Sequence, residues 1–96
     1  MSRESAPHTW TFLTNHTQVL LRIADDSDVT LREIAVAVGI TERAAQRIAA
    51  DLVAAGIIER QRRGRKNHYT VNREAAMRHA AQAEYHIGPL LELFQA

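Results

Sequence analysis

Three side chains suited to reading nucleic acid fall on one side of a predicted helix in the middle of the chain. They are Arg43, Gln46 and Arg47, and their i, i+3, i+4 spacing brings them onto one helical face. Arginine and glutamine make bidentate hydrogen bonds with the edges of guanine and adenine. The alanines around them let the backbone approach a partner closely. We therefore predict that Gln46 and Arg47 contact bases in the major groove of DNA and that Arg43 contacts a base or a phosphate.

A dense run of positive charge follows this helix. The segment Arg60–Lys66 reads RQRRGRK, with five positive charges that repel one another unless an anion lies beside them. β-prone residues flank the run and Gly64 favours a turn, which predicts a β-hairpin with strands at Ile57–Arg60 and Asn67–Val71. Phosphate contacts would resolve the repulsion, and insertion of an arginine into the minor groove is a second mode. A solvated loop is the alternative for the run taken alone. The predicted contact residues are Arg62, Arg63, Arg65, Lys66 and His68.

The residues that other chemistries need are missing or wrongly spaced. The chain has no cysteine, which excludes disulfides, thiolate zinc sites and thiol-based sensing. His79 and His86 lie seven residues apart rather than at the i, i+4 spacing of helical metal pairs. The acidic cluster Asp25–Asp28 lacks the glycine and the following glutamate of a calcium loop. Because no nucleophile with a base and no phosphate loop is present, we predict no enzyme activity, no metal and no cofactor.

Charge is distributed unevenly along the 96 residues. Residues 41–70 carry seven lysines and arginines against three carboxylates, a net charge of +4, whereas residues 1–40 have −2 and residues 71–96 have −1. A basic segment between acidic ends is typical of a nucleic-acid interface. The length and the hydrophobic content of 46% fit one small domain. Since no signal peptide and no apolar run of about 18 residues occurs, we expect a cytoplasmic protein without membrane contact.

Two predicted helices precede the reading helix. The first covers residues 15–24 and uses Thr14 or Asn15 as its N-cap, whose side chain accepts a hydrogen bond from the first turn. The second starts with Thr30 and Glu33, which have the spacing of a capping box. Together these helices supply the apolar faces against which the reading helix can pack.

Two glycines frame the reading helix. Gly39 supplies the left-handed residue that turns the chain before it, and Gly56 stops it after Ala55. Thr41 caps its first turn, and both Thr41 and Glu42 belong to the predicted DNA-binding surface. Two helices joined by a short turn and followed by a hairpin indicate a helix-turn-helix with a wing. The side of the reading helix predicted to be buried carries Ala45, Ile48, Ala49, Leu52 and Val53.

The residues after the hairpin are predicted to form a helical dimerisation segment. Asn72 is a candidate N-cap for a helix between Arg73 and Tyr85, where alanines favour helix. A second helix starts near Pro89, since proline is favoured at the first helical position. Apolar side chains at both chain ends exceed what so small a protein leaves in solvent, so we expect them to pack within the protomer or against a second subunit, and we assign them to the dimer contact. These are Trp10, Phe12, Tyr85, Leu90, Leu91, Leu93 and Phe94.

One combination of residues resembles a known family. The element Leu52–Arg60, LVAAGIIER, is joined to an arginine-rich hairpin that ends at Tyr69. With the preceding helices, it resembles the winged helix-turn-helix of MarR-like and ArsR-like transcriptional regulators over roughly residues 12–71. Shorter stretches at the two ends look like a small group of such regulators in actinobacteria. The fold class is then mainly α with a small β-hairpin (α+β), comprising a three-helix core, a wing and a C-terminal helical segment.

The resemblance also implies a domain organisation and a function. We expect residues 1–10 to form a flexible tail, residues 11–72 the DNA-binding domain and residues 73–96 the dimerisation segment. Such regulators usually act as homodimers on palindromic operators in double-stranded DNA. ArsR-type metal sensors use cysteine clusters or Asp and His on a terminal helix, and this chain has no cysteine and no compact Asp-His pattern. MarR proteins commonly have longer flanking helices around a ligand cleft, and this chain is at the small end of that range. Two alternatives stay open: a winged-helix protein-interaction module, and a ligand-responsive regulator with an effector site at the dimer crevice.

Overall fold

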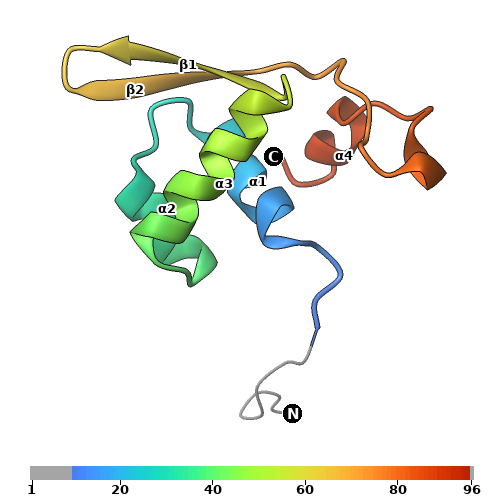
Figure 1. Cartoon of the computed structure of the whole chain (residues 1–96), viewed down its shortest axis with the longest axis horizontal. Helices are drawn as coiled ribbons and strands as arrows, with labels where there is room; N and C mark the ends of the chain where they lie inside the picture. Colours follow the sequence, from blue (N-terminus) through green and yellow to red (C-terminus); the bar gives the residue numbers. More distant parts are fainter. Residues whose placement is uncertain (1–9, 96) are drawn as a thin grey trace.

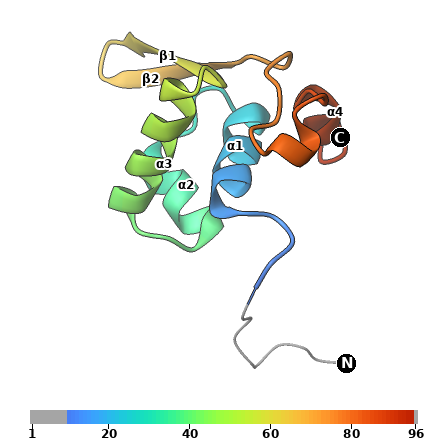
Figure 2. The ribbon, with the colours of Figure 1, turned by 45° about the vertical axis from the view of Figure 1, so that its right-hand side comes forward.

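The computed structural model describes residues 10–95, so residues 1–9 of the predicted tail lie outside it. Figure 1 shows the β-hairpin extending from one side of the helices and the C-terminal segment on the other side, and Figure 2 shows the same arrangement after a turn of 45°. The predicted fold class, mainly α with a small hairpin, is confirmed. Within residues 10–95, no helix is long and apolar enough to cross a membrane. The elements are α1 (Asn15–Asp25), α2 (Leu31–Val38), α3 (Glu42–Ala54), β1 (Ile58–Arg63), β2 (Lys66–Val71), the 3-10 turn η1 (Ala80–Gln82) and α4 (Gly88–Glu92).

Side-chain caps begin the three long helices where the sequence predicts them. The Thr14 hydroxyl accepts a hydrogen bond from the backbone N–H of Thr17 at the start of α1. At the start of α2, Thr30 and Glu33 form the predicted capping box, with bonds of 3.1 and 2.9 Å. These caps satisfy backbone donors that a helix N-terminus otherwise leaves without a partner. Short local motifs therefore define where α1 and α2 begin.

The turn between α2 and α3 uses the predicted glycine. Gly39 has φ +83°, a left-handed conformation. Because glycine has no Cβ, it adopts this conformation with little steric strain. Thr41 then caps α3 by accepting a hydrogen bond of 3.0 Å from the N–H of Ala44. At the other end of the helix, Gly56 has φ +75° and leads into β1. The orientation of α3 is thus set by a left-handed glycine at each end.

A single core joins the three-helix unit, the hairpin and the C-terminal segment. On α3 the buried side is the predicted one, although Val53 is only half-buried. Ile58 and Tyr69 extend the core into the base of the hairpin, and Ile87 and Leu91 close it from the C-terminal segment. The cluster comprises Val19, Leu20, Ile23, Val29, Ile34, Ala35, Ala45, Ile48, Leu52, Ile57, Ile58, Tyr69, Ile87 and Leu91.

The hairpin is longer and its turn tighter than predicted. The strands pair from Ile58 opposite Val71 to Arg63 opposite Lys66, so the turn contains only Gly64 and Arg65. The prediction of a seven-residue tip is therefore wrong. Gly64 has φ +63°, and no other type of residue in the described range has a positive φ. Glycine at the first central position is typical of a type II′ turn, whose twist matches that of paired strands. Most of the arginine run consequently lies on a hydrogen-bonded ladder.

The predicted helix between Arg73 and Tyr85 is not formed. The backbone there doubles back as a narrow loop, with N–H bonds from Met77 to Tyr85 and from Ile87 to Ala75 and only the short turn η1 at its end. Alanine propensity is a weak force, and most helical stability comes from burying an apolar face. This stretch lacks such a stripe. The predicted start of a helix near Pro89 is confirmed by α4, which has Pro89 in its first turn.

Asn72 also has a different role from the predicted helix cap. Its side-chain oxygen accepts a hydrogen bond from the N–H of Glu74, and its amide donates to the carbonyl of Gly56. Asparagine commonly stabilises a turn in this way. Asn72 therefore fastens the end of the hairpin to the end of α3.

Candidate nucleic-acid interface

The outer face of α3 presents the side chains that the sequence predicts as base contacts. Arg43, Gln46 and Arg47 are all exposed, and none of their side chains makes a hydrogen bond or an ion pair within residues 10–95. Thr41 and Glu42 are exposed at the same end of the helix. Because Ile48 and the other buried residues hold the opposite side of α3 in the core, this face is rigidly presented with its polar groups free to bind a partner.

The hairpin presents positive charge on both faces. Successive side chains of a strand point to opposite faces, so Arg60 and Arg62 lie on one face and Arg63 on the other. Arg63 stands directly opposite Lys66 in the register. Like charges at such a position destabilise a sheet in isolation. An anion beside the hairpin would remove this repulsion.

Arg62 also has a structural contact. Its Nε donates a hydrogen bond of 3.2 Å to the carbonyl oxygen of Gly64. This bond braces the two-residue turn and leaves the other guanidinium N–H groups available. A substitution of Arg62 would therefore change both the turn and the charge, whereas Arg63 and Arg65 make no such contact within the described chain.

The wing is fastened to the loop between α1 and α2. Nδ1 of His68 lies 2.8 Å from a carboxylate oxygen of Asp28, and the N–H of Tyr69 donates to the carbonyl of Ser27 at 2.9 Å. Since one ring nitrogen of His68 is used in this pair and its side chain is only 23% exposed, just the other nitrogen is left for DNA. His68 is thus placed chiefly as an anchor of the wing.

The pair with His68 changes the acidity of Asp28. The hydrogen bond from His68 does most to lower the pKa of Asp28 from its ordinary value of 3.8, and the charges of His68, Arg63 and Lys66 act in the same direction, against a partial desolvation. A depressed carboxylate pKa stabilises the folded state above the unfolded-state pKa, and this contribution is lost as the pH falls through the folded-state pKa. The contribution of the Asp28 carboxylate to the folded state is therefore present at neutral pH and is lost in acid, whereas the backbone bond between Tyr69 and Ser27 does not titrate.

Replacing Tyr69 with phenylalanine is expected to raise the free energy of unfolding by about 1–2 kcal/mol. Tyr69 is 2% exposed, and its hydroxyl has no hydrogen-bond partner among the described residues. A buried hydroxyl without a partner costs roughly 1–3 kcal/mol of desolvation, which phenylalanine avoids while keeping the ring. Urea unfolding measures the change. Tyr85→Phe is the matched control, because Tyr85 is 57% exposed; a loss of stability in Tyr69→Phe would instead reveal a hydrogen bond to the buried hydroxyl.

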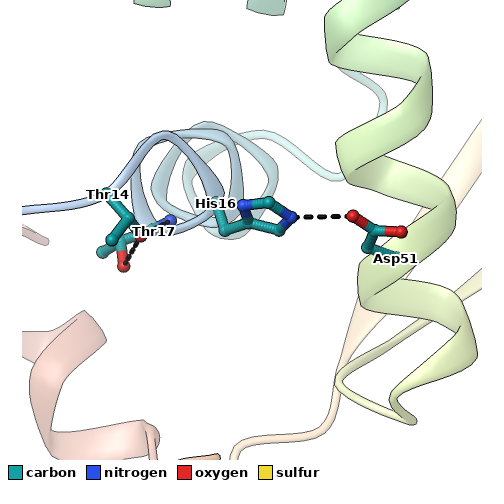
Figure 3. A network of polar contacts seen from close by, with 4 residues as sticks. All are labelled: Thr14, His16, Thr17 and Asp51. Atoms are coloured by element: carbon teal, nitrogen blue, oxygen red, sulfur yellow. Dashed lines mark hydrogen bonds and ion pairs between the residues drawn. The ribbon is translucent and has the colours of Figure 1, made fainter.

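An open groove lies between the first turn of α1, the end of α3 and the C-terminal segment. Its volume is about 660 Å³. At its rim, Nε2 of His16 lies 2.8 Å from a carboxylate oxygen of Asp51 and joins α1 to α3, while Thr14 and Thr17 pair at 3.1 Å beside it (Figure 3). Sequence reasoning missed this groove, because residues 35 positions apart give no local signal of their contact.

The residues predicted to form the dimer divide into two groups. Trp10, Phe12, Tyr85, Leu93 and Phe94 are exposed large side chains, with Phe12 92% and Leu93 77% exposed, while Leu90 is half-buried at the groove. Leu91 differs, because it is 0% exposed in the core of the protomer. Leu91 therefore contributes to the core of its own protomer and not to the predicted dimer contact.

His79 and His86 each have a separate structural partner. Nδ1 of His79 accepts a hydrogen bond from Ala81 at the start of η1, and His86 lies 3.2 Å from Glu74. Among residues 10–95, no three metal-ligating side chains gather in one place. His79 and His86 are thus not brought together as the pair considered from the sequence.

A family model described as MarR family matches residues 11–66. The matched range, more than half of the chain, covers α1, α2, α3, β1 and the first residue of β2. No curated protein is similar enough in sequence to count as a relative. The C-terminal segment lies outside the match, and the ArsR-like and actinobacterial resemblances stay predictions.

Proposed function

The chain belongs to the MarR family, whose members are DNA-binding transcription regulators, and we propose that it binds specific sequences of double-stranded DNA as a homodimer. The observation that carries the proposal is the exposed set Arg43, Gln46 and Arg47 on α3. Their side chains have no partner among residues 10–95, and a hairpin rich in arginine follows the helix directly. Family members are regulators rather than enzymes, and no catalytic role is proposed.

The two elements are assigned different tasks. The first turns of α3 enter the major groove, where Gln46 and Arg47 read base edges and Arg43 reaches a base or a phosphate. The hairpin holds the adjacent backbone or minor groove through Arg63, Arg65 and the neighbouring positive side chains. Two copies related by a two-fold axis would read palindromic half-sites about 34 Å apart. Palindromy, the dimer and a cytoplasmic location are part of the proposal.

Selecting bound fragments from a random DNA pool tests the proposal most directly. An enriched palindromic motif is expected, and the purified protein should bind that motif more tightly than a random duplex. Binding to the random duplex should weaken steeply with salt, because each neutralised phosphate contributes about −0.9 to the slope of log K against log salt. If no duplex is bound even at low ionic strength, the alternative of a protein-interaction module replaces DNA reading.

Removing charge from the hairpin should weaken all DNA binding alike. Arg63→Ala and Arg65→Ala are each expected to reduce the salt slope by about one, with similar losses on cognate and random duplexes, because phosphate contacts carry no base information. Fluorescence anisotropy at several salt concentrations measures both quantities. Arg22→Ala is the control, because Arg22 is an exposed arginine that lies on α1, outside both α3 and the hairpin. A loss confined to the cognate duplex would assign the mutated residue to base reading.

A further inference from the structure

Two aromatic rings stand exposed just before α1. Trp10 is 68% and Phe12 is 92% exposed, and the rings pack edge to face with their centroids 5.1 Å apart. Figures 1 and 2 show the described part of this segment leaving the first turn of α1 and running away from the helices. We call residues 10–13 the aromatic arm. A large aromatic side chain has about 150–250 Å² to bury, so the arm carries substantial apolar surface that the described residues of its own protomer do not cover.

The groove described above begins where the aromatic arm ends. Thr14, the residue directly after the arm, lines it, and its floor is built from core residues such as Leu20, Leu52 and Ile87. Its volume of about 660 Å³ falls within the roughly 300–1,000 Å³ of pockets that accept drug-sized molecules. An indole and a phenyl ring together have the size and the apolar character of such an occupant. The smaller hollow beside Phe94, about 270 Å³, falls below that range.

We propose that the aromatic arm of one protomer inserts into the groove of a second copy of this chain, and that the second copy does the same in return. A two-fold interface brings one surface patch against itself, so it needs a patch that contains both the inserted group and its receptor. The arm and the groove are adjacent and meet this need. The inference rests on the proposed homodimer and specifies which surfaces form it.

The buried area and the polar rim both suit this occupant. Four rings would bury about 600–1,000 Å², and matching groove walls would bring the total to roughly 1,200–2,000 Å², the size of a standard stable interface. The indole N–H of Trp10 needs an acceptor once it is buried. Asp51 supplies one at the rim, because only one of its carboxylate oxygens faces His16 and the other is turned away (Figure 3).

The chain contains one tryptophan, so its fluorescence reports on the arm directly. The full chain is diluted across its monomer–dimer transition, which is followed by sedimentation, while tryptophan emission and quenching by acrylamide are recorded. The proposal requires emission to shift to the blue and quenching to fall as the dimer forms. A dimer whose Trp10 stays solvent-exposed overturns the arm but leaves the proposed homodimer intact. A chain that stays monomeric overturns both.

Two variants separate the arm from the groove. The double variant Trp10→Ala, Phe12→Ala removes both rings of the arm, and Ala54→Arg blocks the groove, since Ala54 lines it from the exposed end of α3. Each should weaken dimerisation by at least about a hundredfold, because neither protomer can then bury the rings of an arm in a groove. Val36→Ala is the control, since Val36 is 77% exposed on α2 outside the groove.

Mixing the two variants gives the decisive result. The Ala54→Arg chain keeps an intact arm and the Trp10→Ala, Phe12→Ala chain keeps an open groove. Their mixed dimer can form one complete insertion and each homodimer none, so an equimolar mixture should dimerise more tightly than either variant alone. A mixture no better than its components overturns the proposal. The proposal is also overturned if the wild-type dimer binds the apolar dye anilinonaphthalene sulfonate and Ala54→Arg abolishes that binding, because the groove would then be open to small apolar molecules.

Discussion

Arg47→Ala is expected to weaken binding to the selected operator by about 5- to 150-fold, while binding to a random duplex changes far less. The side chain lies on the exposed face of α3 with no partner inside the described part of the protein. A bidentate arginine contact with a guanine is worth about 1–3 kcal/mol of discrimination against the wrong base. Its loss should therefore appear mainly as lost preference between sequences.

Competition experiments with the operator and single-base variants measure this preference. The binding profile of Arg47→Ala should flatten at one base pair in each half-site and remain unchanged elsewhere. Arg43→Ala provides a comparison from the same face of α3, where a phosphate contact would lower affinity for all duplexes together. An equal loss on operator and random DNA for Arg47→Ala would remove Arg47 from base reading and leave it as a phosphate contact.

Leu91→Ala is expected to lower the free energy of unfolding by about 2–5 kcal/mol. Leu91 is 0% exposed and belongs to the core cluster that also contains residues of α1 and β1. Truncating a buried leucine removes its transfer free energy and leaves a cavity that the surroundings fill only in part. A 96-residue domain has a small stability margin, so a loss of this size would leave much of the protein unfolded.

Denaturant unfolding at several protein concentrations distinguishes a core role from a dimer role. The destabilisation by Leu91→Ala should be the same at every concentration, since the contact is made within one protomer. Leu93→Ala is the matched control, because Leu93 is 77% exposed two residues away and should change monomer stability by less than about 0.5 kcal/mol. If Leu93→Ala destabilises as much as Leu91→Ala, the C-terminal segment packs differently.

The three long helices and the hairpin were predictable because local motifs determine them. The hydroxyls of Thr14 and Thr41 each accept a hydrogen bond from the backbone N–H three residues later, and this local bond is enough to indicate a helix start. Gly39 marks a helix end by the same kind of local chemistry. The outer face of α3 follows from spacing once its start is known, so its candidate base contacts could be named from the sequence. The register of the hairpin was less predictable, because the arginine run has no strand propensity of its own.

Apart from the helix start near Pro89, the C-terminal segment was not predictable by these means. Its alanines favour helix only weakly, and its conformation depends on where Ile87 and Leu91 find apolar partners. Those partners lie far away in the sequence. The pairs His16–Asp51 and His68–Asp28 are hidden for the same reason, since 35 and 40 residues separate their members. Local patterns therefore identified the exposed face of α3 that is the candidate reading surface, but gave no sign of the groove or the wing anchor.

The closure of the core by Ile87 and Leu91 affects how the protein folds during synthesis. The three helices and the hairpin leave the ribosome first, and domains fold from the N-terminus as they emerge. Leu20 and Ile57, which share the groove floor with Ile87, stay uncovered until the chain has grown about 20 residues past the hairpin. At about 5–20 residues per second, this interval lasts roughly 1–4 s. During it, the nascent chain exposes apolar surface of the kind that chaperones bind, and it completes its fold only after every residue of its candidate DNA-reading surface has been made.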